Sequence, residues 1–270
     1  MSKNISKDDV IAHKKNAIRK VNNLLESYIN SDEPDLLKKA DLISYWLESF
    51  SSYVSFEERF DPSRLLNYKR GDVIRVNFGF NVGKELGGLH FAVVIDNETK
   101  RNAHVLTVVP LSSTDGRDIH QRNVDLGTEL FTKVSDVQKK LIDDAQARLK
   151  LIVQNANTLT AVVDLLKDVE TTEQNSSEID AKLQDVIERA KQLFDEKALV
   201  EKQIQRMERN EKEIQKMKAG SMAVINQITT ISKQRIYTPK HSEDFLYNVS
   251  LSSTAMDKIN EKIKEQYIFS

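Results

Sequence analysis

The stretch GGLHFAVVIDNETKRNAHVLTVVPLSS, residues 87–113, decides the fold class because it holds two β-rich runs around a polar turn. The runs HFAVVID and HVLTVVPL are short, apolar and rich in valine, and the segment NETKRNA between them has turn composition. This pattern predicts an antiparallel hairpin of strands 90–96 and 104–111, with the pairing centred near Lys100.

The predicted hairpin brings two polar side chains to one end, away from its turn. Pairing centred at Lys100 puts position 90 across from about residue 110, so His90 and Ser112 become diagonal cross-strand neighbours, about 7–8 Å apart. The glycine-containing loop 83–88 directly precedes this end. We therefore expect an imidazole, a hydroxyl and a loop at one mouth of the fold.

Further β-rich segments occur on both sides of a long interval without breakers. GDVIRVNFGF (71–80) alternates apolar and polar residues, RNVDL (122–126) is a short run, and MAVINQITTIS (222–232) resumes the β pattern. Five or six short strands predict a small antiparallel barrel or sheet. Because the β pattern stops near 130 and resumes near 220, the helical interval is predicted to be an insertion within the β-domain.

The interval between Gly127 and Gly220 contains neither glycine nor proline and is rich in helix-forming residues. Two heptad seams run through it, separated by the polar segment 171–178, and Ser176 is suited to cap the second helix. We expect an antiparallel coiled-coil hairpin with arms of roughly 50–65 Å, the alternative being seams that pair between two chains. The seam positions are Ile152, Ala156, Leu159, Val163 and Leu166, then Ile179, Leu183, Val186, Ala190, Leu193, Lys197, Val200, Ile204, Met207, Glu211, Ile214 and Lys218.

The two ends of the chain also read as helix. Residues 1–67 carry two apolar stripes at helical spacing, the first interrupted at Lys14, with Pro34 at a helix start between them. A third stripe follows Ser253. The predicted class is α+β, and the predicted domains are an N-terminal helical hairpin (1–67), a discontinuous β-domain (68–130 and 219–270) and the inserted helical hairpin (131–218).

Composition narrows the class of protein. The formal net charge is −1, so no general basic surface for nucleic acid is indicated, and the absence of cysteine excludes disulfides and thiolate zinc sites. The first 30 residues lack an apolar signal region, and no run of about 18 apolar residues occurs. We expect a cytoplasmic protein with no membrane partner.

Several motifs in order resemble the MazF/PemK family of toxin endoribonucleases. They are KRGDVIRVNFGFNVGKELGGLHFAVVI, then VLTVVPLSS, then INQITTISKQRI, spread over residues 68–126 and 220–268. The resemblance implies a Src-homology-3-like antiparallel β-barrel, a homodimer, and cleavage of single-stranded RNA without a metal or other cofactor. The segments 1–67 and 131–218 lie outside the family pattern.

The resemblance also implies catalytic residues. The family pair is an arginine just after the Gly-Gly loop and a threonine at the end of the next strand, and these positions are His90 and Ser112 here. Serine keeps the hydroxyl, whereas histidine loses a permanent cation but is able to act as acid or base. Glu85 is a second acid/base candidate or a reader of an exocyclic amine, and Lys84 or Arg75 is the candidate for the missing cation.

The predicted RNA-binding residues are those that match positions near the family's RNA groove. They are Asn81, Lys84, Ser113, Thr114, Asn226 and Gln227.

The favoured function is the toxin of a toxin-antitoxin system, a metal-independent, sequence-specific endoribonuclease that uses the ribose 2′-OH. The implied partners are single-stranded RNA, a cognate antitoxin and a second copy of the chain. The alternatives are a non-catalytic binding toxin with the same barrel, like the gyrase poisons, and a coiled-coil interaction protein with a vestigial barrel.

Overall fold

The computed structural model describes residues 5–114, 116, 118–167 and 176–268. The chain forms two compact units, each made of segments that are separate in sequence. The first unit contains residues 1–61 and 77–89, and the second contains residues 62–76 and 90–270.

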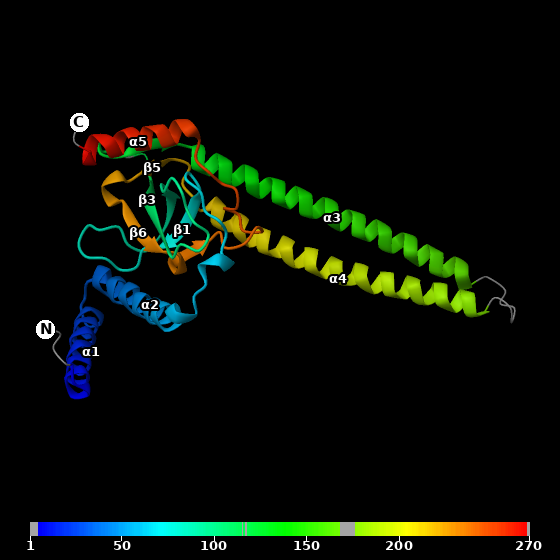
Figure 1. Ribbon diagram of the computed structural model, residues 1–270, viewed down its shortest axis with the longest axis horizontal. Helices are drawn as coiled ribbons and strands as arrows, with labels where there is room; N and C mark the ends of the chain where they lie inside the picture. Colours follow the sequence, from blue (N-terminus) through cyan, green and yellow to red (C-terminus); the bar gives the residue numbers. More distant parts are fainter. Residues whose placement is uncertain (1–4, 115, 117, 168–175, 269–270) are drawn as a thin grey trace. The chain divides into compact units, whose positions relative to one another are not determined.

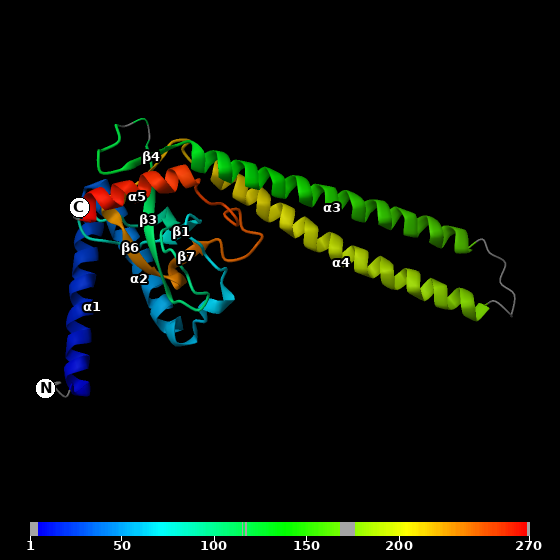
Figure 2. The same cartoon turned by 45° about the horizontal axis from the view of Figure 1, so that its top comes forward.

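The first unit contains the helices α1 (Lys7–Ile29) and α2 (Pro34–Phe56), followed by the short 3-10 helix η1 (Glu57–Arg59). Ser6 caps α1 in a capping box with Asp9. Of the residues in α1, all of which the structure describes, none is buried, and the two helices diverge from their junction (Figures 1 and 2). The first apolar stripe, which is interrupted at Lys14, thus leaves α1 without a buried face.

The second unit contains an antiparallel sheet, which confirms the α+β class. Among the described residues seven strands pair, in the order β4-β5-β3-β2-β1-β7, with β6 on β3. The β-rich segments on either side of the helical interval therefore belong to one sheet. The strands are β1 (Val73–Asn77), β2 (Leu89–Val94), β3 (Val105–Ser113), β4 (Val124–Gly127), β5 (Ser221–Ala223), β6 (Thr229–Ser232) and β7 (Ile236–Thr238).

The sheet is not closed by hydrogen bonds, in contrast to the expected barrel. The strands at the two ends of the order are β4 and β7, and among the described residues no ladder joins them. β6 and β7 follow each other through the 3-10 helix η4 (Lys233–Arg235), but they pair with different strands, β6 with β3 and β7 with β1. The described strands thus form a barrel-like but open sheet.

The helices α3 (Glu129–Lys167) and α4 (Ser176–Gln215) leave the sheet together and lie side by side, antiparallel (Figures 1 and 2). Gln138 Nε2 donates to Met207 O (2.7 Å), and Arg148 pairs with Glu196 (3.1 Å). Of the seam residues with described side chains, all are buried or half-buried except Glu211 and Lys218. The seams therefore pair within the chain, whereas the side chains of Leu166 and Ile179 lie outside the described residues.

The base of this helical hairpin is part of the core of the second unit. Leu130, Val134 and Ile214 are buried with residues of β1, β3 and α5 (Ser253–Tyr267) in one apolar cluster. Burying one such side chain contributes about 1.5–3 kcal/mol, so the base is held firmly by packing. The start of α3 and the end of α4 thus pack into the same core as the sheet.

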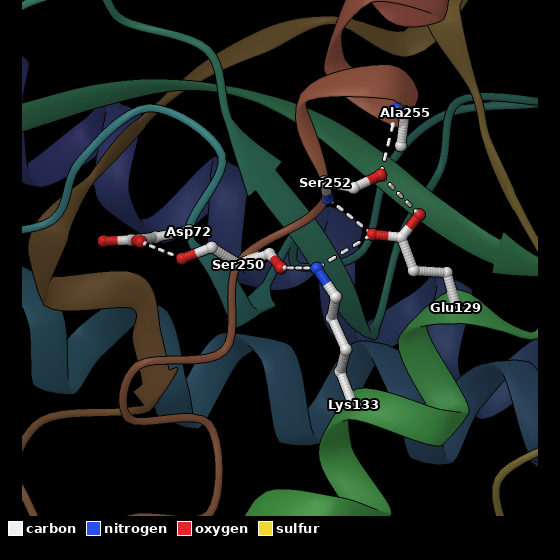
Figure 3. A network of polar contacts seen from close by, with 6 residues as sticks. All are labelled: Asp72, Glu129, Lys133, Ser250, Ser252 and Ala255. Carbon is white, nitrogen blue, oxygen red and sulfur yellow. Dashed lines mark hydrogen bonds and ion pairs between the residues drawn. The ribbon is translucent and has the colours of Figure 1, made fainter.

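A polar network joins the start of α3 to the start of α5 (Figure 3). Glu129 accepts hydrogen bonds from the backbone N–H and the hydroxyl of Ser252, and it pairs with Lys133 (3.0 Å). Lys133 Nζ also donates to Ser250 O (2.6 Å), and the Ser250 hydroxyl donates to Asp72 Oδ1 (2.6 Å). Partial burial raises the pKa of the Glu129 carboxyl, but the Ser252 N–H, Lys133 and the Ser252 hydroxyl together bring it below its usual value.

Candidate functional site

The β2–β3 hairpin carries the two residues expected at the mouth of the fold, His90 and Ser112. Phe91 pairs with Leu111, and the register continues without a shift towards the turn. Extending this antiparallel register by one residue places His90 opposite Ser112. The two are therefore direct cross-strand neighbours instead of the diagonal pair expected, because the hairpin is centred one residue beyond Lys100.

The type of pairing brings these two side chains close together. Ile95 N–H donates to Thr107 O (3.0 Å), which marks that pair as a hydrogen-bonded one. Because the two kinds of pair alternate along an antiparallel ladder, His90 and Ser112 form a non-hydrogen-bonded pair, with Cα atoms about 4.5 Å apart and side chains on the same face. Both residues are half-buried, so each is partly exposed to solvent.

Two further strands extend this pair into a row. Ser112 pairs with Met222 of β5, and Met222 pairs with Asp125 of β4. Because opposite residues share a face, His90, Ser112, Met222 and Asp125 form one row across four strands, which ends in an exposed carboxylate. Asn123 Nδ2 contacts Met222 Sδ (3.5 Å) beside it. Sequence reasoning missed this row because β5 reaches β3 and β4 only after the long helical insertion.

Ser113 and Thr114, both predicted to bind RNA, do not extend the row. Ser113 follows Ser112 on β3, so its side chain alternates to the opposite face of the sheet. Thr114 N–H donates to Gly220 O (3.1 Å), and a Cβ at Gly220 would lie 2.2 Å from Thr114 Oγ1. Thr114 thus packs against the chain where it returns from the helices.

Asn226 and Gln227 lie in the 3-10 helix η3 (Ile225–Gln227), which follows β5. Asn226 is exposed and Gln227 is half-buried. Val224 N–H donates to Pro110 O (2.9 Å), so the chain entering η3 runs along β3 away from Ser112. Asn226 and Gln227 therefore lie beside the middle of β3 and not beside Ser112 at its end.

Asn81, Lys84 and Glu85 lie in the loop 77–88, which belongs to the first unit. Asn81 Nδ2 donates to Leu86 O (2.7 Å), and Glu85 Oε2 accepts from Val82 N–H (3.3 Å), while Lys84 is exposed. The loop closes tightly because Gly88 N–H donates to Gly79 O (2.6 Å), and a Cβ at Gly87 would lie 2.7 Å from that same oxygen. Gly87 is thus required by a close backbone approach, and Gly88 by its positive φ of 82°.

The comparison with protein families finds a match for part of the chain. Residues 69–157 match the model of the PemK-like, MazF-like toxin of type II toxin-antitoxin systems. Residues 69–157 form a PemK/MazF-like toxin domain. The match begins just before β1 and ends within α3, so α1, α2 and the strands β5 to β7 lie outside it. No curated protein sequence matches the chain.

Within the toxin domain, Arg75 does not lie on the face of the His90–Ser112 pair. Its guanidinium lies 5.6 Å from the ring centroids of Phe91 and Tyr237. Phe91 follows His90 on β2 and points to the other face, so Arg75 is not the cation beside the imidazole. It pairs instead with Glu213 (3.8 Å), whose pKa is lowered mainly by Lys216 and more weakly by Arg75.

A buried lysine supports the turn of the toxin domain's β2–β3 hairpin. Lys233 is 1% exposed, and its ammonium donates to the carbonyls of Lys100 (3.3 Å) and Arg101 (3.1 Å) in that turn. Burial lowers the pKa of Lys233, and Asp96 acts in the opposite direction. By holding the turn, Lys233 helps to fix the register that pairs His90 with Ser112.

Two further searches cover the described part of the chain. No group of three or more His, Asp or Glu side chains lies close enough there to hold a metal ion. None of the helices in that part combines the length and the apolar character that a membrane span requires.

Proposed function

We propose that this chain is a toxin of a type II toxin-antitoxin system that cleaves single-stranded RNA at a short sequence, without a metal, by using the ribose 2′-OH. The observation that supports this most is the register of β2 and β3, in which His90 faces Ser112 at a solvent-accessible end of the toxin domain. An acid/base group and a hydroxyl donor beside each other suit a reacting phosphodiester.

In the proposed reaction the 2′ oxygen attacks the adjacent phosphorus and the bond to the 5′ oxygen breaks. One base takes the proton from the 2′-OH, and one acid gives a proton to the departing 5′ oxygen, which yields a 2′,3′-cyclic phosphate and a 5′-OH. His90 transfers a proton at one of these oxygens, and the Ser112 hydroxyl donates to a non-bridging phosphate oxygen. On sequence grounds Glu85 stays a candidate either for the second proton transfer or for reading an exocyclic amine, and Lys84 stays a candidate for the cation.

The proposal includes partners that the toxin domain implies. Single-stranded RNA is the substrate, a cognate antitoxin is the inhibitor, and a second copy of the chain completes a homodimer. We further propose that the exposed end of the four-strand row, at Asp125, takes part in base recognition, because a carboxylate accepts from exocyclic amines.

The test is cleavage of a mixed single-stranded RNA by the full-length chain in the presence of a chelator, followed by sequencing of the ends. We expect defined ends with a 2′,3′-cyclic phosphate, and no cut where the attacking ribose is replaced by deoxyribose. His90→Ala should reduce cleavage by about 10²–10⁴-fold, the usual contribution of one acid/base group. The matched control is His13→Ala, an exposed histidine of α1.

Circular dichroism spectra of the variants should match that of the unmodified chain. Intact RNA with the well-folded full-length chain would contradict the nuclease proposal and favour a binding toxin. Unchanged cleavage by the His90→Ala variant would remove His90 from the mechanism.

A further inference from the structure

The first unit contains a cavity with two walls, and one of these walls lies outside the residues that match the toxin family. It has a volume of about 420 Å³, is open on one side, and is lined by α2 and the loop 77–88. α2 contributes Tyr45 and Trp46, and the loop contributes Asn81 and Glu85. Since the family match begins at residue 69, the α2 wall is a feature that this chain adds to the domain.

The aromatic wall of the cavity is held in place on several sides. Trp46 packs against Gly79, where an added Cβ would lie 2.7 Å from Trp46 Cζ2, and Gly79 has a positive φ of 81°. The indole is also 6.0 Å from the ring of Phe50 and 6.3 Å from that of Tyr53. Tyr53 in turn accepts a hydrogen bond from Asn77 Nδ2 (3.4 Å). A flat ring is therefore presented at a fixed position, with the loop backbone beside it.

The polar wall of the cavity offers hydrogen-bond acceptors. Asn81 uses its side-chain N–H on Leu86 O, and Glu85 uses Oε2 on Val82 N–H, so Asn81 Oδ1 and Glu85 Oε1 take no part in these loop contacts. Carboxylate and amide oxygens accept hydrogen bonds from amino groups. Lys39 also lines the cavity and adds a positive charge suited to a phosphate, and its ammonium is 5.3 Å from the centroid of the Tyr28 ring.

We propose that this cavity is a subsite for one unstacked nucleobase of the RNA substrate, and that it prefers a base with an exocyclic amino group. The base stacks on the aromatic wall formed by Trp46 and Tyr45, and its amine donates to Glu85 and Asn81. The volume lies in the lower part of the range of small-ligand sites, which suits a single nucleotide. This inference rests on the proposed RNA-cleaving function and extends it to a segment outside the toxin domain.

Binding is measured directly, because Trp46 is the only tryptophan in the chain and reports on its own cavity. Titration of the full-length chain with cytidine monophosphate should quench its fluorescence in a saturable manner. Uridine monophosphate, which has a carbonyl in place of the amine, should bind about tenfold more weakly, because its carbonyl cannot donate to the acceptors. Glu85→Gln should reduce this preference, since an amide both donates and accepts. Absence of saturable quenching, or equal binding of the two nucleotides, would overturn the proposal.

Variants separate stacking from folding. Trp46→Ala should weaken cytidine monophosphate binding about tenfold in calorimetry and raise the KM for RNA cleavage, whereas Trp46→Phe should stay close to the unmodified chain because a ring remains. Tyr45→Ala removes the other ring of the same wall. Because the Tyr45 side chain is 64% exposed, its removal should leave the packing of α2 unchanged. Leu47→Ala, an exposed neighbour that does not line the cavity, is the matched control.

The outcomes of these experiments test the nucleobase subsite and the RNA-cleaving function separately. If the chain cleaves RNA but the Tyr45→Ala and Trp46→Ala variants keep the original KM and nucleotide affinity, the subsite is wrong and the nuclease stands. If cytidine monophosphate binds as expected and no RNA is cut, the subsite stands and the nuclease fails. Faster cleavage by the Trp46→Ala variant would show that α2 restrains the loop, and would also overturn the subsite.

Discussion

At position 90 the chain has an imidazole, where the resemblance to the toxin family implies a guanidinium. An imidazole provides at most two donors and changes its charge near neutral pH, whereas a guanidinium provides five donors and is always charged. With Arg75 on the opposite face of the sheet, its guanidinium supplies no permanent positive charge beside Ser112. The Ser112 hydroxyl, held between β2 and β5, therefore carries more of the stabilisation of the phosphorane in the proposed mechanism.

Ser112 is the residue that tests this reasoning. Ser112→Ala should lower kcat/KM for RNA cleavage by about 10²–10³-fold, as expected for loss of one donor to the transition state. Ser112→Thr keeps the hydroxyl and suits a strand, so it should retain cleavage within about tenfold. Thr107→Ala, on the same strand but paired with Thr230 of β6, controls for loss of a hydroxyl from β3. Equal activity of the Ala and Thr variants at position 112 would rule out a role for the hydroxyl.

At the scale of elements, the β2–β3 hairpin was predictable from the sequence but its register was not. Valine-rich runs around NETKRNA are sufficient to predict the two strands. The one-residue displacement of the centre depends on the turn, and Lys233 stabilises that turn from more than a hundred residues away. The pairing of Met222 and Asp125 with this hairpin is equally long-range, so no local pattern reveals it.

The network at the start of α3 gives a prediction about stability and pH. Glu129→Gln should lower the free energy of unfolding by about 1–3 kcal/mol at neutral pH, because the amide loses the ion pair with Lys133 and one acceptor for Ser252. The pKa of Glu129 is lowered in the folded state, so its stabilisation is present above the usual carboxyl range. This stabilisation is lost as the pH falls through the lowered pKa of Glu129. In acid, the Glu129→Gln variant and the unmodified chain should therefore have the same free energy of unfolding.

Urea unfolding at a series of pH values measures this effect. Glu261→Gln, an exposed carboxylate on α5, is the control and should change stability by less than about 0.5 kcal/mol. A constant difference between the Glu129→Gln variant and the unmodified chain at all pH values would show that the carboxylate charge does not contribute.

At the scale of the whole molecule, the distribution of glycine and proline predicted where the β-material is interrupted. The strands before and after the helices do form one sheet, and α3 and α4 pair within the chain. The open sheet and the divergence of α1 from α2 were not predictable, because both depend on which apolar faces find a partner in three dimensions. The grouping of the loop 77–89 with α2 also escaped prediction, since Trp46 was visible only as one member of an apolar stripe. The three-domain division expected from sequence stays a proposal.

At this scale, a deletion tests whether folding and RNA cleavage need the full length of the helical hairpin. Replacing residues 153–192 by a short Gly-Ser turn removes the distal parts of α3 and α4 but keeps the Gln138–Met207 and Arg148–Glu196 contacts. Because Val134 and Ile214 at the base supply the core contacts, the shortened chain should fold and cleave RNA within about threefold of the full-length chain. Val134→Ala, by contrast, should cost on the order of 2 kcal/mol of stability, since it opens a cavity in that core. A folded, shortened chain that loses cleavage and its dimeric mass in light scattering together would instead assign the distal helices to the dimer contact.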